Sequence, residues 1–130
     1  TTNLKVLEAT NIAPLINDIF ILTFDILEAR KMIYNKLKNY SNYLIDARMG
    51  GEEFSIRTSK MNDEKDLIEH DEDFNLIPTE IPCGEKSVIY SVLNISSEVC
   101  NIVKKINENQ IFPKSLRRHM KANFLLSDIK

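Results

Sequence analysis

Four side chains in this chain of 130 residues have the chemistry of nucleophiles or soft metal ligands, namely Cys83, Cys100, His70 and His119. A zinc site of the usual kind needs four such ligands, grouped in close pairs along the sequence. These four residues are scattered, so we expect no metal site. Acidic residues surround His70 and basic residues surround His119, and we expect both histidines at the surface.

Neither thiol has the sequence context of an activated nucleophile. Cys100 lies in an apolar-rich stretch and is expected to be a small core residue. Cys83 is expected to be more exposed and more reactive, but no histidine lies near it in sequence to activate it. The three glycines of the chain cannot form a phosphate-binding loop. We therefore predict no catalytic residues, no cofactor and no enzymatic activity.

An acidic string, Asp71-Glu72-Asp73-Phe74-Asn75, matches the first five positions of a calcium-binding EF-hand loop. That loop also needs a glycine at its sixth position and a glutamate at its twelfth, where this chain has Leu76 and Pro82. Residues 61–73 contain seven acidic residues and one lysine. We predict that this segment is an exposed, mobile loop or a short polar helix, and that calcium does not order it.

A glycine pair lies in the most distinctive short motif of the chain. The string Arg48-Met49-Gly50-Gly51-Glu52-Glu53-Phe54 resembles the GGDEF or GGEEF signature of diguanylate cyclases, in which the glycines and acids sit on a hairpin that holds nucleotide and metal. No Asp-Xaa-Asp-Xaa-Phe-Lys metal segment of that family precedes it, and no strand pattern flanks it on both sides. We interpret the two glycines as the end of a helix, followed by a polar strand.

The strongest periodic signal is a run of apolar and aromatic residues at steps of three and four, which predicts one long helix over residues 12–48. Such a helix would be roughly 55 Å long, whereas a compact domain of this size has a diameter of roughly 35 Å. It would therefore overhang, unless it breaks at residues 39–42, which are poor in helix formers. We predict that its second half binds a partner through Ile33, Leu37, Tyr40 and Leu44.

Basic residues surround three apolar residues near the C-terminus. Leu116, Met120 and Phe124 lie at helical spacing and predict a short third helix from about Lys114. Its cations could face phosphates, an acidic partner or a membrane surface, or could only be solvated. The cations are Lys114, Arg117, Arg118 and Lys121. The acids of residues 61–85 also make intramolecular docking of this basic segment possible.

The remaining patterns predict one strand over 53–60, an extended segment over 74–81 and a second helix over 88–107. The β-branched residues of 88–95 leave a strand as the alternative there. The whole chain, 1–130, is expected to form a single domain. Its expected fold class is mainly α with a small β element, with α+β as a possibility, built from three helices around one core.

With 43% apolar residues, 28% charged residues and a net charge of -2, the composition is that of an ordinary globular protein. No apolar run is long enough to span a membrane and no leader pattern opens the chain, so we expect an intracellular protein, cytoplasmic or nuclear. We predict a non-enzymatic module for protein–protein interaction or assembly, whose partner is another protein or a second copy. The alternative is a nucleic-acid-associated protein that binds through its basic C-terminal helix.

Overall fold

The computed structural model describes residues 18–23, 26–50, 53–76, 89–119 and 124–128. Within these ranges the chain forms five strands and three helices. In chain order they are β1 (Ile19–Leu22), α1 (Leu27–Leu37), β2 (Tyr43–Gly50), β3 (Glu53–Lys60), α2 (Glu64–Leu76), α3 (Ile89–Asn107), β4 (Ser115–His119) and β5 (Phe124–Asp128).

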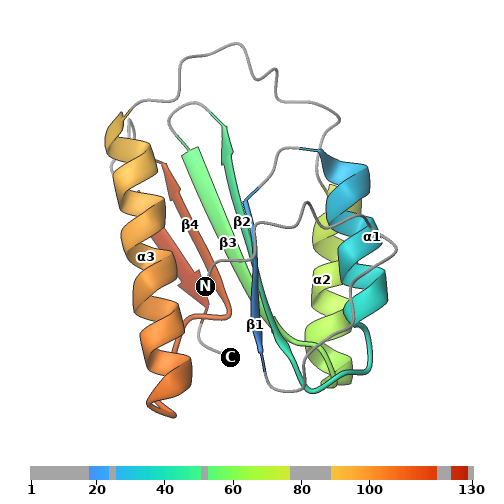
Figure 1. Ribbon diagram of the computed structural model, residues 1–130. Helices are drawn as coiled ribbons and strands as arrows, with labels where there is room; N and C mark the ends of the chain where they lie inside the picture. The colour runs from blue at the N-terminus through green and yellow to red at the C-terminus, as the bar shows by residue number, and fades with distance from the viewer. Residues whose placement is uncertain (1–17, 24–25, 51–52, 77–88, 120–123, 129–130) are drawn as a thin grey trace, which may run out of the picture.

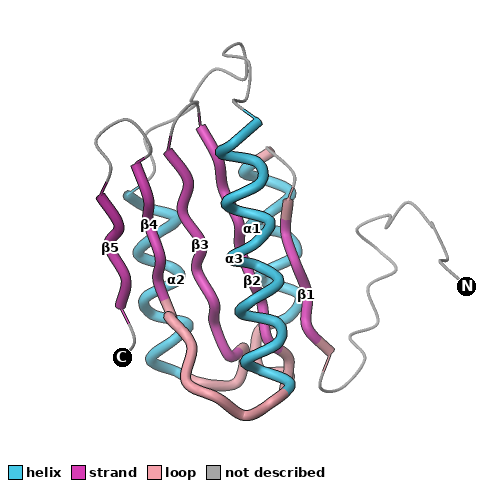
Figure 2. Tube along the Cα trace, turned by 90° about the vertical axis from the view of Figure 1, so that its left-hand side faces the viewer, coloured by secondary structure: helices cyan, strands magenta, loops and turns pink. Residues whose placement is uncertain are grey.

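The five strands form one mixed sheet in the order β1-β2-β3-β4-β5. Strands β1 and β2 are parallel and are connected through α1, whereas every later pair is antiparallel. Helices α1 and α2 cover one face of the sheet and α3 covers the other (Figure 1). Figure 2 shows the strands side by side, with β1 and β5 at the two edges.

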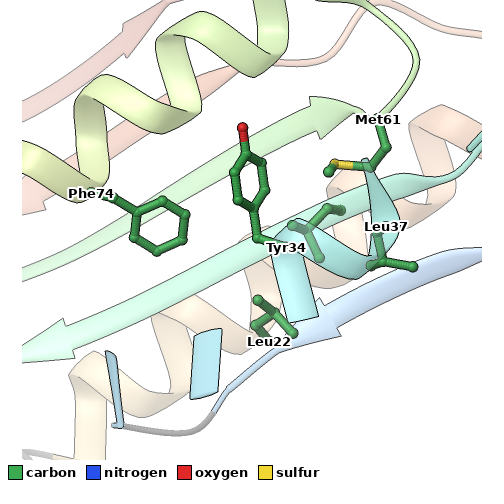
Figure 3. Packing of buried hydrophobic residues seen from close by; sticks show 6 residues of the cluster. Leu22, Tyr34, Leu37, Met61 and Phe74 are labelled. Atoms are coloured by element: carbon green, nitrogen blue, oxygen red, sulfur yellow. The ribbon is translucent and has the colours of Figure 1, made fainter. Parts of the chain in front are cut away.

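The first core lies between the sheet and the pair α1 and α2. Figure 3 labels buried side chains of this core that come from β1, α1, α2 and the turn after β3. The buried members of this core are Leu22, Tyr34, Leu37, Leu44, Met61 and Phe74. The second core lies under α3 and consists of Ile45, Ala47, Phe54, Ile56, Ile102 and Leu116. Strand β2 contributes to both cores, so it is buried on both faces.

Asparagine residues in the left-handed conformation follow two of the helices. Asn39, just after α1, has φ 71°, and Asn109, just after α3, has φ 54°. The amide of Asn109 donates to the carbonyl of Ile106, and the amide of Gln110 donates to that of Lys105. These two bonds form a Schellman motif, in which asparagine tolerates the positive φ better than most residues.

The expected fold class is wrong, because the chain folds as α+β around a five-stranded sheet and not as a helical domain with a small β element. The single helix predicted over 12–48 is replaced, within the described residues, by β1, α1 and β2. Helix α1 ends at the segment 39–42, which the sequence marks as the weak point. Strands buried on both faces are apolar at consecutive positions, and such runs also satisfy helical spacing.

The third helix, predicted from about Lys114, is also wrong, because residues Ser115–His119 form β4 between β3 and β5. Of the two alternatives predicted for the acidic segment 61–73, the polar helix is confirmed, because the segment forms most of α2, and the loop is wrong. The Asp63 carboxylate accepts the Asp66 amide at 3.1 Å and so caps this helix. Residues 74–76, predicted to be extended, complete α2, and residues 77–81 lie outside the described ranges.

Two predictions for the middle of the chain are confirmed. The strand predicted over 53–60 is β3, with the same bounds. The helix predicted over 88–107 is α3, which begins at Ile89 in the described residues, so the strand alternative for 88–95 is wrong.

Candidate functional site

The chemistry-bearing side chains of the described structure meet in a buried cluster between the sheet and helices α1 and α2. We call it the Asp46 cluster. Its members are Arg30 on α1, Asp46 and Arg48 on β2, Ser59 on β3 and His70 on α2. Asp46, Arg48 and Ser59 belong to one face of the sheet, because side chains alternate along each strand. The fold brings these five residues together from four separate elements.

Two arginines hold the Asp46 carboxylate. One oxygen contacts Arg30, and the other accepts a bond of 2.9 Å from Nε of Arg48. Arg30 also donates through Nη2 to the Ala47 carbonyl at 2.9 Å. Because the side chains of Asp46 and Arg30 are almost completely buried, water cannot replace these partners. The guanidinium of Arg30 therefore fixes α1 to β2.

The surroundings of Asp46 set its protonation. Burial alone would raise the pKa of Asp46, but the contacts with His70 and Arg48 and the charges of Arg48 and Arg30 together lower the pKa well below its usual value. The carboxylate is thus charged throughout the neutral and mildly acidic range.

Acid should weaken the fold through this carboxylate. An aspartate in the unfolded chain titrates at about pH 3.9, above the native pKa, so below about pH 4 the unfolded state binds more protons than the native state. The contribution of Asp46 is complete above that pH and is lost as the pH falls toward the native pKa. Urea unfolding at several pH values should show a steeper acid loss of stability for the natural chain than for Asp46→Asn. Equal slopes would contradict this assignment.

His70 links the cluster to Ser59. Its Nδ1 lies 2.8 Å from Oγ of Ser59, and its Nε2 lies 3.4 Å from Oδ2 of Asp46. The imidazole stacks against the rings of Tyr34 and Phe74, with centroid distances of 4.6 and 5.1 Å, and these two rings also contact each other at 5.3 Å. The prediction that His70 lies at the surface is therefore wrong, because the helix periodicity of α2 turns it toward the sheet.

Serine, histidine and aspartate are the residue types of a catalytic triad, in which the serine hydroxyl attacks a substrate. In this structure Ser59, His70 and the Asp46 side chain are all fully buried. Two pockets of about 450 and 240 Å³ open on the described surface, and none of the three residues lines either pocket. The arrangement cannot reach a substrate in this conformation, and its chemistry is that of a buried, hydrogen-bonded anchor.

Tyr34 closes the cluster on the side of α2. Its hydroxyl donates to the Leu67 carbonyl at 3.0 Å. Burial, and after it the charge of Asp71, raises the pKa of Tyr34 above its usual value. The phenol therefore stays protonated and remains a donor that connects α1 to α2.

The predicted partner-binding seam does not form one surface. Leu37 on α1 and Leu44 on β2 are completely buried in the first core, and Ile33 packs against that core. Tyr40 lies in the turn after α1 and is 46% exposed. Two of the four residues therefore stabilise the domain itself and are not accessible to a partner.

The described cations of the predicted basic surface contact residues on three other elements of the domain. Lys114 pairs with Asp66 on α2 at 2.5 Å, and Arg117 pairs with Glu53 on β3 at 3.0 Å. Arg118 donates to the Asn94 side chain on α3 at 2.9 Å. Lys121 lies outside the described residues. The basic helix on which the nucleic-acid alternative relied is therefore absent, because the segment forms β4, and its described cations have partners within the domain.

The motif Arg48–Phe54 does lie at a hairpin, since Gly50 ends β2 and Glu53 begins β3. Our interpretation of the glycine pair as the end of a helix is therefore wrong. Glu53, the acid of the motif that the structure describes, pairs with Arg117. Among the described residues, no three His, Cys, Asp or Glu side chains lie together as a metal site would require.

Of the two cysteines, Cys100 is exposed on α3 and is not the core residue that we expected, whereas Cys83 lies outside the described residues. The outer face of α3 also carries a feature that the sequence reasoning missed. Near the start of the helix, Ile89 and Leu93 are 74% and 64% exposed. We name them, together with the exposed side chains of Tyr90 and Val92, the α3 patch. The signal for this patch in the sequence is the group of apolar and aromatic residues at positions 89–93, which covers more of the helix surface than one buried stripe can.

Comparison with models of protein families, with curated proteins and with solved structures gives no match to this chain. In the described part, none of the helices is both long enough and apolar enough to cross a bilayer.

Proposed function

We propose that this protein is a protein-interaction module that binds the apolar face of another protein through the α3 patch. The observation that carries the proposal is the exposure of Ile89 and Leu93, four residues apart on one side of α3. Residues at this spacing are neighbours on a helix surface. Burying their side chains against a partner would contribute about 25 cal/mol of binding free energy for each Å² of apolar surface removed from water.

The rest of the outer face of α3 supports this position for the partner. After the α3 patch, the exposed side of the helix continues with Ser96, Ser97 and Asn101. An apolar centre beside polar residues is typical of a binding surface and its rim. The opposite side of α3 is already occupied, since Ile102 is fully buried against the sheet.

Leu93→Asp tests the proposal, with Asn101→Asp two turns further along the exposed face as the matched control. Photo-crosslinking from position 93 in the native host should identify a partner that position 101 does not capture. The binding of that purified partner should then weaken more than about tenfold in Leu93→Asp, because loss of a central apolar contact costs about 2 kcal/mol or more.

Both variants should unfold in urea at nearly the natural midpoint, because both positions are exposed. A partner whose affinity is the same for both variants would overturn the proposal. So would equal crosslinking from the two positions.

A further inference from the structure

Among the described residues, the outer edge of β5 has no neighbouring strand. In the strand order β5 comes last and pairs only with β4, and no strand in the described ranges pairs with its other side. Alternate backbone N–H and C=O groups of an edge strand point away from the sheet, and they can bond to a further strand. The five residues Phe124–Asp128 thus present a template for strand addition.

The helices leave room beside this edge. Helix α3 packs on β2 and β3 and reaches β4 at Leu116 and Arg118, and α2 packs on β3, so β5 lies one strand away from these contacts. At the other end of the sheet, α1 and α3 lie on opposite faces near β1 and β2 (Figure 2). An incoming strand would therefore meet helices on both faces at β1, whereas at the β5 end Figure 2 shows a helix, α2, on one face only, behind β4.

The sequence of β5 lacks the usual protection of an edge. Natural edge strands carry lysine, proline or inward-pointing charges that prevent pairing with another chain. Strand β5 reads Phe-Leu-Leu-Ser-Asp, with no lysine, arginine or proline, and its one charge is at its last residue. An unprotected edge of this kind pairs readily with another strand.

We propose that the β5 edge binds the β5 edge of a second copy of this chain, antiparallel and around a twofold axis. A strand of five residues can pair with itself over its full length only when its middle residue lies on the axis. In that register Leu126 lies opposite Leu126 of the second copy, Leu125 opposite Ser127, and Phe124 opposite Asp128. The two sheets then become one continuous sheet of ten strands, with the self-complementary interface that a symmetric dimer requires.

Light scattering over a concentration series tests the pairing. The natural chain should reach twice the mass of one chain at high micromolar concentration. Leu126→Lys and Leu126→Glu should each remain monomeric, because like charges directly opposite each other destabilise a strand pair. An equimolar mixture of these two variants should recover the double mass. Ile21→Lys, the matched change on the edge strand β1, should leave the dimer intact.

A crosslink provides a second measurement that does not rely on a disruptive charge. With Cys83 and Cys100 replaced by serine, Leu126→Cys should form a disulfide-linked dimer much faster than Ile21→Cys. Opposite Cα atoms in an antiparallel pair are about 4.5 to 5.5 Å apart, which is within disulfide range.

Several outcomes would overturn the inference. A natural chain that stays monomeric at high micromolar concentration would do so, as would a dimer that persists in Leu126→Lys. A dimer that is lost in Ile21→Lys would place the interface at β1. A dimer that is lost in Leu93→Asp would place the interface at the α3 patch. If the α3 patch binds no partner protein, the proposed pairing of the β5 edges is unaffected.

Discussion

Replacing Asp46 by alanine should remove about 3 to 5 kcal/mol from the free energy of unfolding, because Arg30 would stay buried without its carboxylate. The Arg30 side chain is 6% exposed, and it spans from α1 to the backbone of β2. Domains of this size are stable by only about 5 to 15 kcal/mol in total. The variant should therefore be close to the threshold of folding.

The exposed pair of Lys38 and Asp71 supplies the control. The Asp71 side chain is 51% exposed and lies 3.3 Å from Nζ of Lys38. Asp71→Ala should change the free energy of unfolding by less than about 1 kcal/mol, because water already screens this pair. Urea unfolding followed by circular dichroism measures both variants. If Asp46→Ala lost no more stability than Asp71→Ala, the Asp46 cluster would not be the anchor described above.

Leu37→Asp should prevent folding. Leu37 is completely buried in the first core, beside Tyr34 and Met61. An unpaired carboxylate at this position costs several kcal/mol, in addition to the lost apolar packing. The sum is comparable with the whole stability of the domain.

Tyr40→Asp provides the comparison, because Tyr40 is 46% exposed in the turn after α1. This variant should retain a cooperative unfolding transition near the natural midpoint. The partner-binding seam predicted from the sequence implies the opposite for Leu37, since it places Leu37 and Tyr40 on one exposed surface, where a substitution would leave the chain folded. A folded Leu37→Asp chain would contradict the packing of α1.

Local signals predicted β3 and α3 well. Strand β3 alternates between buried and half-buried positions, with Phe54 and Ile56 on its apolar side, and this period of two cannot be mistaken for a helix. Helix α3 keeps its apolar residues at steps of three and four over five turns, and this pattern prevails over the β-branched residues near its start.

The first half of the chain was mispredicted because its first two strands, β1 and β2, carry apolar residues on both faces. Strand β1 is Ile-Phe-Ile-Leu, and in β2 the residues Leu44–Ala47 are all buried. Consecutive apolar positions fit steps of three and four as easily as steps of two. Helix α2 was predicted only as an alternative to a loop, because its acids gain partners such as Arg57 and Lys114 only in the folded state.

The Asp46 cluster could not be predicted from sequence. Its five residues come from α1, β2, β3 and α2, and no short motif contains more than two of them. His70 lies between acidic neighbours in sequence, and only the orientation of α2 places it over Ser59. The partners of a buried charge are decided by tertiary packing, which the linear order of residues does not show.

The strand order of the sheet is the same as the order along the chain, and this has a consequence for folding kinetics. Each strand pairs with its immediate predecessor, so the sheet can grow by one strand at a time. Two of the four pairings close over connections of a few residues and one closes over α1, whereas β3 and β4 are separated by residues 61–114, which include both α2 and α3. Closing that long connection is the entropically costly step, so β4 and β5 should join a preformed unit of β1, α1, β2, β3 and α2. During synthesis the Asp46 cluster would then be complete before the last strands leave the ribosome.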